Sequence, residues 1–197
     1  MHLMWADGYG AVSVDRICKA AGVNKGSFYH FFPSKEALTL ATIDAIWELA
    51  ESGFYMPAFD PSLHPLERIN RFAELTHTYH HRRSTSDWKA EQGCPFGNVG
   101  AEVGSNDHAI RERVRAVYDA EARYFKNALT EAVAMAAIPA QDVADSASRL
   151  VALHTGLMMH AKVYNDSGWI HNFLPAAANI IRARFDGRRL AVSEARA

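Results

Sequence analysis

The sequence predicts an all-α protein made of two helical modules, and three observations carry this prediction. Apolar residues recur with the helical period of about 3.6 over most of the 197-residue chain. Alternating runs of β-branched and polar residues, which are typical of strands, are missing from the sequence. Helix-capping residues stand at the ends of the periodic segments. With 49% hydrophobic and 22% charged residues, the chain can also bury a sizeable core.

The predicted helices begin and end at residues that commonly cap or terminate helices. Ser13, Asn24 and Ser34 are placed to cap the first three, while Gly22 and Pro33 end the first two. In chain order, the predicted helices span residues 14–21, 25–31, 35–52, 65–83, a short segment from 95, a long segment from 108 to the Ile138-Pro139 break, 141–165 and 168–186. A proline-rich linker is expected between 53 and 65, and the tail from 187 is expected to fray.

Charge and cysteine content narrow the class of protein. The net charge of −1 excludes a polycationic chain, so nucleic-acid binding would need a local basic cluster. Cys18 and Cys94 do not form a disulfide framework, and a reducing, cytoplasmic setting is expected. We expect no membrane span, because no apolar run reaches about 18 residues, and no signal peptide. Phosphate-cradling glycine loops and nucleophile–base sets are missing too, so neither an enzyme nor a cofactor is expected.

Residues 14–31 have the pattern of a helix-turn-helix, in which two short helices are joined by a three-residue turn containing Gly22. Glycine suits the positive φ that such a turn requires. The predicted small core of this unit consists of Ile17, Cys18, Val23, Phe28 and Phe31. A helical hairpin with a solvated polar face is the alternative interpretation.

The second helix of this unit carries residues suited to DNA, because a recognition helix places its first residues on base edges in the major groove. DNA contacts are predicted from Lys25, Gly26, Ser27, Tyr29 and His30. Lys35, in the first turn of the next helix, is predicted to bind a phosphate. Residues 14–35 hold four Lys or Arg and one Asp, a net charge of +3.

The stretch from Gly8 to Leu38 resembles the DNA-binding signature of the TetR/AcrR family of repressors. The matching segments are Ser13–Ile17, Ala20–Val23, Lys25–Phe32 and Ser34–Leu38. The resemblance implies an all-helical homodimer that binds a double-stranded DNA operator through a helix-turn-helix domain, residues 1–47. A ligand-binding and dimerisation domain, residues 48–197, would release the DNA when a small-molecule inducer binds. Only Met1–Asp7 precede the signature, so a truncated first helix is expected.

A looser resemblance concerns the segment Gly93–Asn98. Together with Ala101–Val103 and Gly156–Lys162, it is similar to the branch of the family that contains the N-ethylmaleimide-reductase repressor. That branch responds to reactive electrophiles. The resemblance therefore implies a sensor cysteine at Cys94.

The residues around Cys94 support the same hypothesis by their chemistry. Pro95 suits the first position of a helix, which places Cys94 at the N-cap, where the helix dipole favours a thiolate. His154, Met158 and Lys162 are spaced four apart and share a helix face. If that face points inward, Lys162 lies near Cys94 and activates it. A buried cysteine acting as a small hydrophobe is the alternative.

A plain cavity for a neutral ligand is the other expected inducer site. Its candidate lining residues are Phe72, Thr76, Tyr79, Phe96, Tyr118, Phe125, Met158 and Met159. Ordinary core packing would use the same side chains.

A histidine cluster suggests a rival function. His77, His80 and His81 lie within about one helical turn, a spacing that could bind Zn²⁺ in a metal-dependent helical enzyme or metal sensor. Arg82 and Arg83 follow directly and disfavour a cation. Histidines near a helix C-terminus are the alternative interpretation.

The last two predicted helices carry apolar stripes that suit a dimer. The stripes consist of Leu150, Leu153, Leu157, Ala161, Tyr164, Trp169, Phe173, Ala177, Ile180 and Ile181. A two-fold four-helix interface would bury both stripes, whereas burial within one subunit is the alternative. A third interpretation of the chain is a partner-type helical protein with a defective DNA arm.

Overall fold

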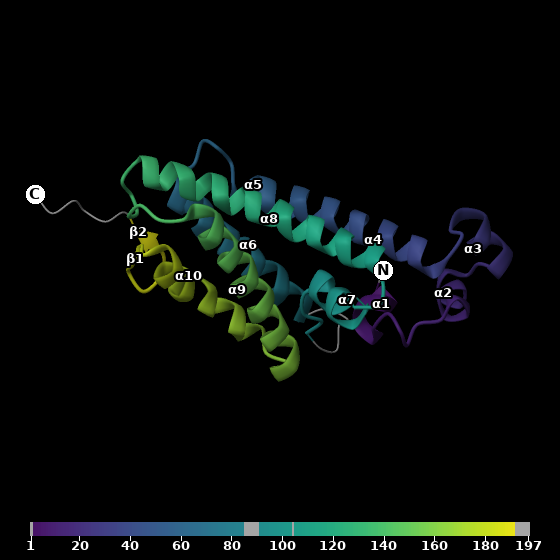
Figure 1. Cartoon of the computed structure of the whole chain (residues 1–197). Coiled ribbons are helices and arrows are strands. Elements are labelled where there is room, and N and C mark those ends of the chain that lie inside the picture. Colours follow the sequence, from purple (N-terminus) through teal and green to yellow (C-terminus); the bar gives the residue numbers. More distant parts are fainter. Residues whose placement is uncertain (1, 85–90, 104, 192–197) are drawn as a thin grey trace, which may run out of the picture. The chain divides into compact units, whose positions relative to one another are not determined.

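The computed structural model describes residues 2–84, 91–103 and 105–191, and it confirms the all-α class (Figure 1). The helical elements are α1 His2–Asp7, α2 Val14–Ala21, α3 Lys25–Phe31, α4 Lys35–Ala50, the π-helical turn η1 Glu51–Tyr55, α5 Met56–Ala58, α6 Pro65–Ser84, α7 Pro95–Val103, α8 His108–Ala134, α9 Val143–Tyr164, the 3-10 helix η2 Ser167–Asn172 and α10 Phe173–Ile181. Strands β1 Arg184–Phe185 and β2 Leu190–Ala191 pair antiparallel, with Arg184 opposite Ala191. No helix of these described ranges is long and apolar enough to cross a membrane.

The described residues fall into two compact units. The first contains residues 1–49 and 94–117, and the second contains residues 50–93 and 118–197. The first segment ends close to the boundary expected at residue 47, but residues 94–117 group with the amino-terminal helices. Each unit is therefore built from chain segments that are separated in sequence.

The first unit contains the amino-terminal helices, α7 and the start of α8. Its buried side chains include Val12, Cys18, Phe28, Thr39, Ile43, Phe96, Ile110 and Val114. Arg16 forms an ion pair with Asp7 at 2.6 Å, which connects α2 to α1. Arg113 of α8 pairs with Asp44 of α4. The first pair joins consecutive helices, and the second joins helices through residues 69 apart in sequence.

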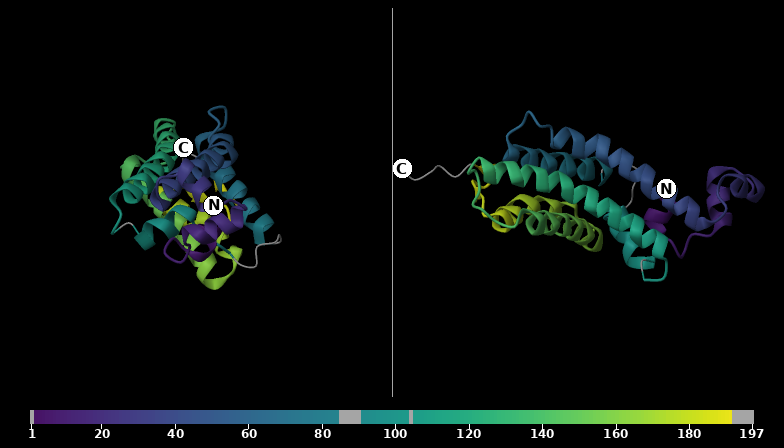
Figure 2. Two further views of the ribbon diagram at one scale, coloured as in Figure 1. Left: turned by 90° about the vertical axis from the view of Figure 1, so that its right-hand side faces the viewer. Right: turned by 45° about the horizontal axis from the view of Figure 1, so that its top comes forward.

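The second unit has an aromatic core. Phe72 of α6, Phe125 of α8 and Phe173 of α10 are almost completely buried. The ring centroids of Phe72 and Phe125 lie 5.0 Å apart, and those of Phe72 and Phe173 lie 5.6 Å apart. In the views of Figures 1 and 2, α9 and α10 run side by side. Burial of these large rings stabilises the unit.

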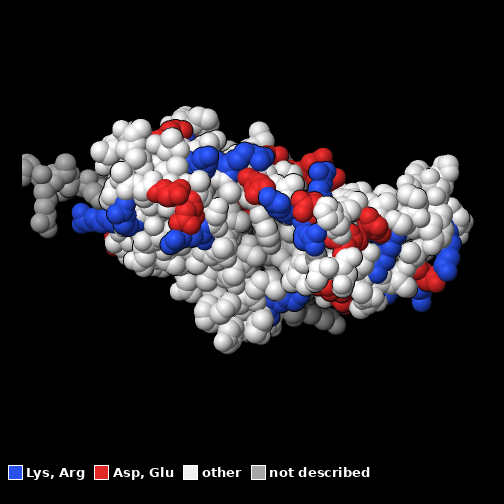
Figure 3. Space-filling model, viewed as in Figure 1, with Lys and Arg blue, Asp and Glu red and all other residues white. Residues whose placement is uncertain are grey.

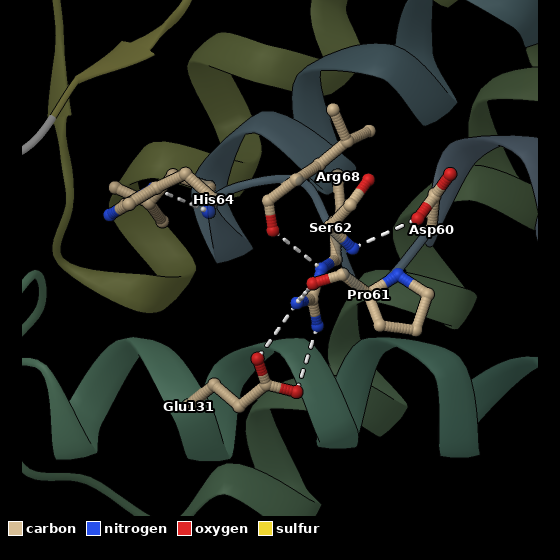
Figure 4. Close-up of polar contacts among 8 residues, drawn as sticks. Asp60, Pro61, Ser62, His64, Arg68 and Glu131 are labelled. Carbon is tan, nitrogen blue, oxygen red and sulfur yellow. Dashed lines mark hydrogen bonds and ion pairs between the residues drawn. The ribbon is translucent and has the colours of Figure 1, made fainter.

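Arg68 joins the loop before α6 to α8 (Figure 4). Its buried guanidinium donates hydrogen bonds to the backbone oxygens of Pro61 and Leu63, at 2.9 and 3.0 Å. Two further N–H groups reach the two Glu131 carboxylate oxygens, each at 2.8 Å. Such a bidentate pair fixes both distance and orientation.

Two expectations about where structured segments end are wrong. The helical path does not stop near Gly53 but continues through η1 and α5, because Pro57 lies in the first turn of α5, where its missing N–H costs little. Fraying was expected from residue 187, but β2 Leu190–Ala191 is formed and paired within the described residues. The Asn70 side chain accepts a hydrogen bond from Leu190 N–H at 2.8 Å and donates to Leu190 O at 3.1 Å. This pairing holds the β1–β2 hairpin on α6.

Candidate nucleic-acid interface and sensor residues

The helix-turn-helix has the capping that the sequence predicts. The Ser13 hydroxyl accepts a hydrogen bond from Arg16 N–H at 3.2 Å and begins α2. Gly22, at φ 67°, ends α2 in the left-handed conformation. The Asn24 side chain then accepts from Ser27 N–H at 2.8 Å and begins α3. Local chemistry thus sets where α3 starts.

The outer face of α3 is open to solvent. Lys25, Gly26, Tyr29 and His30 are exposed, and Ser27 is half-buried. The opposite face buries Phe28, whose ring packs edge-on against Tyr29 at 5.1 Å. The candidate DNA-contacting residues therefore share an accessible surface, as a recognition helix requires.

The ammonium group of Lys25 is held by a neighbouring carboxylate. Its Nζ lies 2.8 Å from Asp15 Oδ1 of α2, and this contact raises the pKa of Lys25. Cationic and acidic side chains are interspersed on the face drawn in Figure 3. A phosphate would have to compete with Asp15 for Lys25.

Part of the predicted small core is wrong. Val23 is 45% exposed and Phe31 is 74% exposed, although Cys18 and Phe28 are buried as expected. The reason is that α3 ends at Phe31, and Phe32 instead turns its ring toward Phe28, 6.0 Å away. The buried Val12, in the segment before α2, supplies apolar contact that the motif does not reveal.

Lys35 is engaged within the protein. Its Nζ donates to the backbone oxygen of Tyr9 and lies 4.0 Å from the centroid of the Tyr9 ring. Burial lowers the pKa of Lys35, and the nearby Glu102 carboxylate opposes this effect. The predicted phosphate contact remains untested and would require Lys35 to leave these partners.

Cys94 occupies the N-cap of α7. Its Sγ accepts a hydrogen bond from Gly97 N–H at 3.2 Å, and its backbone oxygen accepts from Asn98 N–H at 2.9 Å. The thiol is buried and is not in a disulfide. A backbone donor and the positive end of a helix both favour a thiolate.

The residue before Cys94 lies against α9. Gly93 has φ 71°, and a Cβ built on it would come within 3.2 Å of two Lys162 side-chain carbons and 3.4 Å of Met158 O. Glycine is therefore needed for the chain to pass this close to α9. The Lys162 side chain and the backbone oxygen of Met158 both lie on the side of α9 that faces Gly93.

Several candidate pocket residues meet in the second unit. The ring of His154 lies 4.9 Å from that of Phe72, which also contacts Phe125. Thr76 and Met158 are buried, and Tyr79 stacks edge-on against Phe54 at 4.8 Å. Tyr118 is half-buried in the same unit, as is Met159, whereas Phe96 belongs to the first unit.

Comparison with known proteins decides the family. One family model, described as bacterial regulatory proteins of the tetR family, matches residues 1–42. A second, described as the tetracyclin repressor-like C-terminal domain, matches residues 65–177. The chain belongs to the TetR family. The resemblance noted from the helix-turn-helix is thus confirmed, and this TetR-family chain is a DNA-binding transcriptional regulator.

Individual relatives of this TetR-family chain cover most of its length. Transcriptional regulator AcuR of Cereibacter sphaeroides is 30% identical over 167 residues, which is 84% of this chain and 74% of the relative. The transcriptional repressor DhaR of Mycobacterium sp. GP1 is 26% identical over 170 residues, 85% of this chain and 80% of the relative.

Solved structures agree in fold. A TetR regulatory protein of Rhodobacter sphaeroides superposes with a TM-score of 0.80 at 29% identity and covers 91% of this chain and 93% of its own. Reduced NemR of Escherichia coli has a TM-score of 0.78 at 20% identity, covering 98% and 93%. The second likeness concerns the fold alone.

Sequence reasoning missed several residues of this TetR-family chain. The aromatic core also contains Tyr55, Phe59 and Tyr124, with Tyr55 and Tyr124 centroids 5.3 Å apart. Glu121 is buried beside them, and burial raises its pKa to about 8, although a hydrogen bond with Tyr55 opposes the shift. Its place four residues before Phe125, on the apolar face of α8, is a signal that could have revealed it.

The histidine cluster gives no complete metal site within the described residues. His77 lies on α6 with its ring 3.9 Å from that of His171 of η2. The side chains of His80 and His81 lie outside the described residues. Among the described side chains, no three His, Cys, Asp or Glu residues are grouped so that they could hold a metal ion.

Proposed function

We propose that this chain is a cytoplasmic, homodimeric repressor that leaves its operator when a small molecule or reactive electrophile acts on it. The observation that carries the proposal is the exposed polar face of α3 opposite the buried Phe28. The repressor DhaR, similar over most of the chain, supports repression as the mode.

The amino-terminal half of α3 enters the major groove. Gly26 lets the backbone approach the bases, while Lys25 and His30 offer charge or hydrogen bonds to phosphates. The hydroxyls of Ser27 and Tyr29 supply further donors. These contacts are electrostatic in large part, so affinity falls steeply with salt.

Dimerisation uses the exposed face of α9 and α10. Val163 and Tyr164 are largely exposed, and Leu153, Leu157 and Ile180 are only half-buried in one chain. By contrast, the core of a single subunit already buries Leu150, Phe173 and Ile181. The remaining apolar surface supports a two-fold four-helix interface.

Cys94 is the proposed reaction point for an electrophile. The thiolate adds to an activated alkene and forms a carbon–sulfur bond, and the resulting carbanion takes a proton from solvent. Lys162, whose side-chain carbons lie against Gly93, is the proposed activating cation. A neutral ligand among Phe72, Phe125 and His154 is the alternative mode of induction.

DNA binding is tested with a duplex that the protein selects from a random pool. Tyr29→Ala and His30→Ala should each weaken binding by about tenfold, which corresponds to one lost specific contact. Glu112→Gln, an exposed change on α8, is the matched control. Unchanged affinity in both α3 variants, with no salt dependence, would contradict the proposal.

Sensing is tested by alkylation of the thiol with N-ethylmaleimide as a function of pH. A reactive Cys94 is alkylated well below pH 8.5, the region of an ordinary thiol pKa, and Cys94→Ser abolishes the effect on DNA. If alkylation follows an ordinary thiol profile and leaves DNA bound, the thiol mechanism is wrong, and the neutral-ligand mode is favoured.

A further inference from the structure

Near the end of α7, Glu102 holds the backbone of the segment that leads into the helix-turn-helix. Its carboxylate accepts hydrogen bonds from Tyr9 N–H at 2.7 Å and from Gly10 N–H at 2.6 Å. The two donors are adjacent in sequence and 92 to 93 residues away from Glu102. Bonds from backbone N–H groups to a carboxylate are charge-assisted and stronger than neutral ones.

The segment is shaped to receive this carboxylate. A Cβ on Gly8 would lie 2.9 Å from Glu102 Oε2, and one on Gly10 would lie 2.9 Å from Oε1. Gly8 also has φ 88°, which other residues rarely adopt. The conformation of Gly8 favours glycine, and the missing side chains at both positions leave room for the Glu102 carboxylate where it lies.

Two further contacts fix the same segment. Lys35 of α4 donates to Tyr9 O, and Asn98 of α7 donates to Trp5 O of α1 at 3.5 Å. Only Ala11 and Val12 separate Gly10 from Ser13, the N-cap of α2. The contacts with α7 thereby fix the location in space of the segment from which α2 begins.

These contacts lie on one path within the first unit. Helix α7 begins at the Cys94 N-cap and presents Glu102 two turns later. We propose that the Glu102 carboxylate is the positioning residue through which a displacement of α7 changes the position of the helix-turn-helix. The proposal rests on the proposed function, because it assigns the route by which the sensor reaches the DNA-binding helices.

Amide exchange tests the route directly. In a Cys18→Ser background, Cys94 is the only thiol, and its modification by N-ethylmaleimide is verified by mass. Exchange at the Tyr9 and Gly10 amides should rise at least about fivefold on modification, since a hydrogen bond to a charged group is lost. If the reagent does not reach the buried thiol, Cys94→Trp displaces α7 instead.

Glu102→Gln keeps the shape of the side chain but removes the charge and one good acceptor. In this variant, exchange at Tyr9 and Gly10 should already be fast, and modification of Cys94 should change neither exchange nor operator affinity by more than about twofold. Glu112→Gln, which alters an exposed carboxylate in the same unit, should behave like the parent.

The outcomes separate the two claims. The role of Glu102 is overturned if the Tyr9 and Gly10 amides stay protected from exchange in Glu102→Gln. It is also overturned if their exchange does not change when α7 is displaced, even if the chain binds and releases DNA. If the amides respond as expected but the protein ignores every duplex, the proposed function fails while the connection from α7 to the helix-turn-helix stands.

Discussion

At the scale of single residues, Glu121 couples the stability of the second unit to pH. Its side chain is almost fully buried, and burial raises its pKa to about 8 from an ordinary value of 4.5. The folded chain therefore holds a proton that the unfolded chain releases between these values. The contribution of Glu121 to the free energy of unfolding is therefore fully present below pH 4.5 and is lost as pH rises through about 8.

Glu121→Gln should remove this pH dependence, because glutamine resembles the protonated carboxyl group and does not ionise. We expect the variant to exceed the parent in unfolding free energy at pH 9 by a few kcal/mol, at roughly 1.4 kcal/mol for each pH unit between 4.5 and about 8. At pH 4, the two should be nearly equal. Urea unfolding across this range measures the difference, with the exposed Glu74→Gln as control. Parallel pH profiles for parent and Glu121→Gln would refute the argument.

A second residue-scale prediction concerns Asp15, which holds the Lys25 ammonium at 2.8 Å. Both side chains are more than half exposed, so the pair adds little to stability. Asp15→Asn frees Lys25 and removes a negative charge next to the DNA, and it should tighten operator binding several-fold at low salt. Lys25→Gln should weaken binding and reduce the salt slope by about one. Fluorescence anisotropy titrations measure both. Weaker binding by Asp15→Asn would count against a phosphate contact from Lys25.

At the scale of elements, the bidentate contact of Arg68 holds the start of α6 to α8. Arg68→Lys keeps the charge but cannot reproduce the fork, so the Pro61 and Leu63 carbonyls lose donors. We expect a loss of about 1–3 kcal/mol in unfolding free energy. Arg149→Lys, in an exposed pair with Asp145, should cost less than about 0.5 kcal/mol. Equal effects in chemical denaturation would show that burial of Arg68 contributes nothing.

Helix boundaries that depend on local chemistry could be predicted from the sequence. Ser13, Asn24 and Gly22 act on backbone groups within four residues, so their roles are visible in the sequence. The exposure of Phe31 could not be predicted, because whether this side chain is covered depends on where the next helix passes. The β1–β2 hairpin could not be predicted either, since it is held by contacts between Asn70 and Leu190, which are 120 residues apart.

In the candidate site too, features set by local sequence could be predicted and long-range contacts could not. The outer face of α3 follows from helical periodicity and was predicted. Glu102 lies in the segment Ala101–Val103, which was singled out from the sequence, but its contacts were not predicted. Its partners are backbone N–H groups 92 to 93 residues away, and the sequence does not show which backbone groups a side chain meets. Glu121 was not predicted because glutamate is rarely buried, so the residue type outweighed its position on the apolar face of α8.

At the scale of the whole molecule, the two-fold symmetry of the proposed dimer constrains the operator. Two recognition helices related by a two-fold axis fit two half-sites about one helical turn apart, roughly 10 bp between centres. Inserting 5 bp between the half-sites turns one of them to the opposite face of the duplex. Binding should then fall at least about 100-fold toward non-specific affinity. Electrophoretic titration of the selected duplex, the 5 bp insertion and a single half-site measures this. The chain carries a net charge of −1, so affinity must come from the basic segments 14–35 of the two chains acting together. A single half-site bound as tightly as the full operator would show that one chain suffices and that the dimer is not the DNA-binding form.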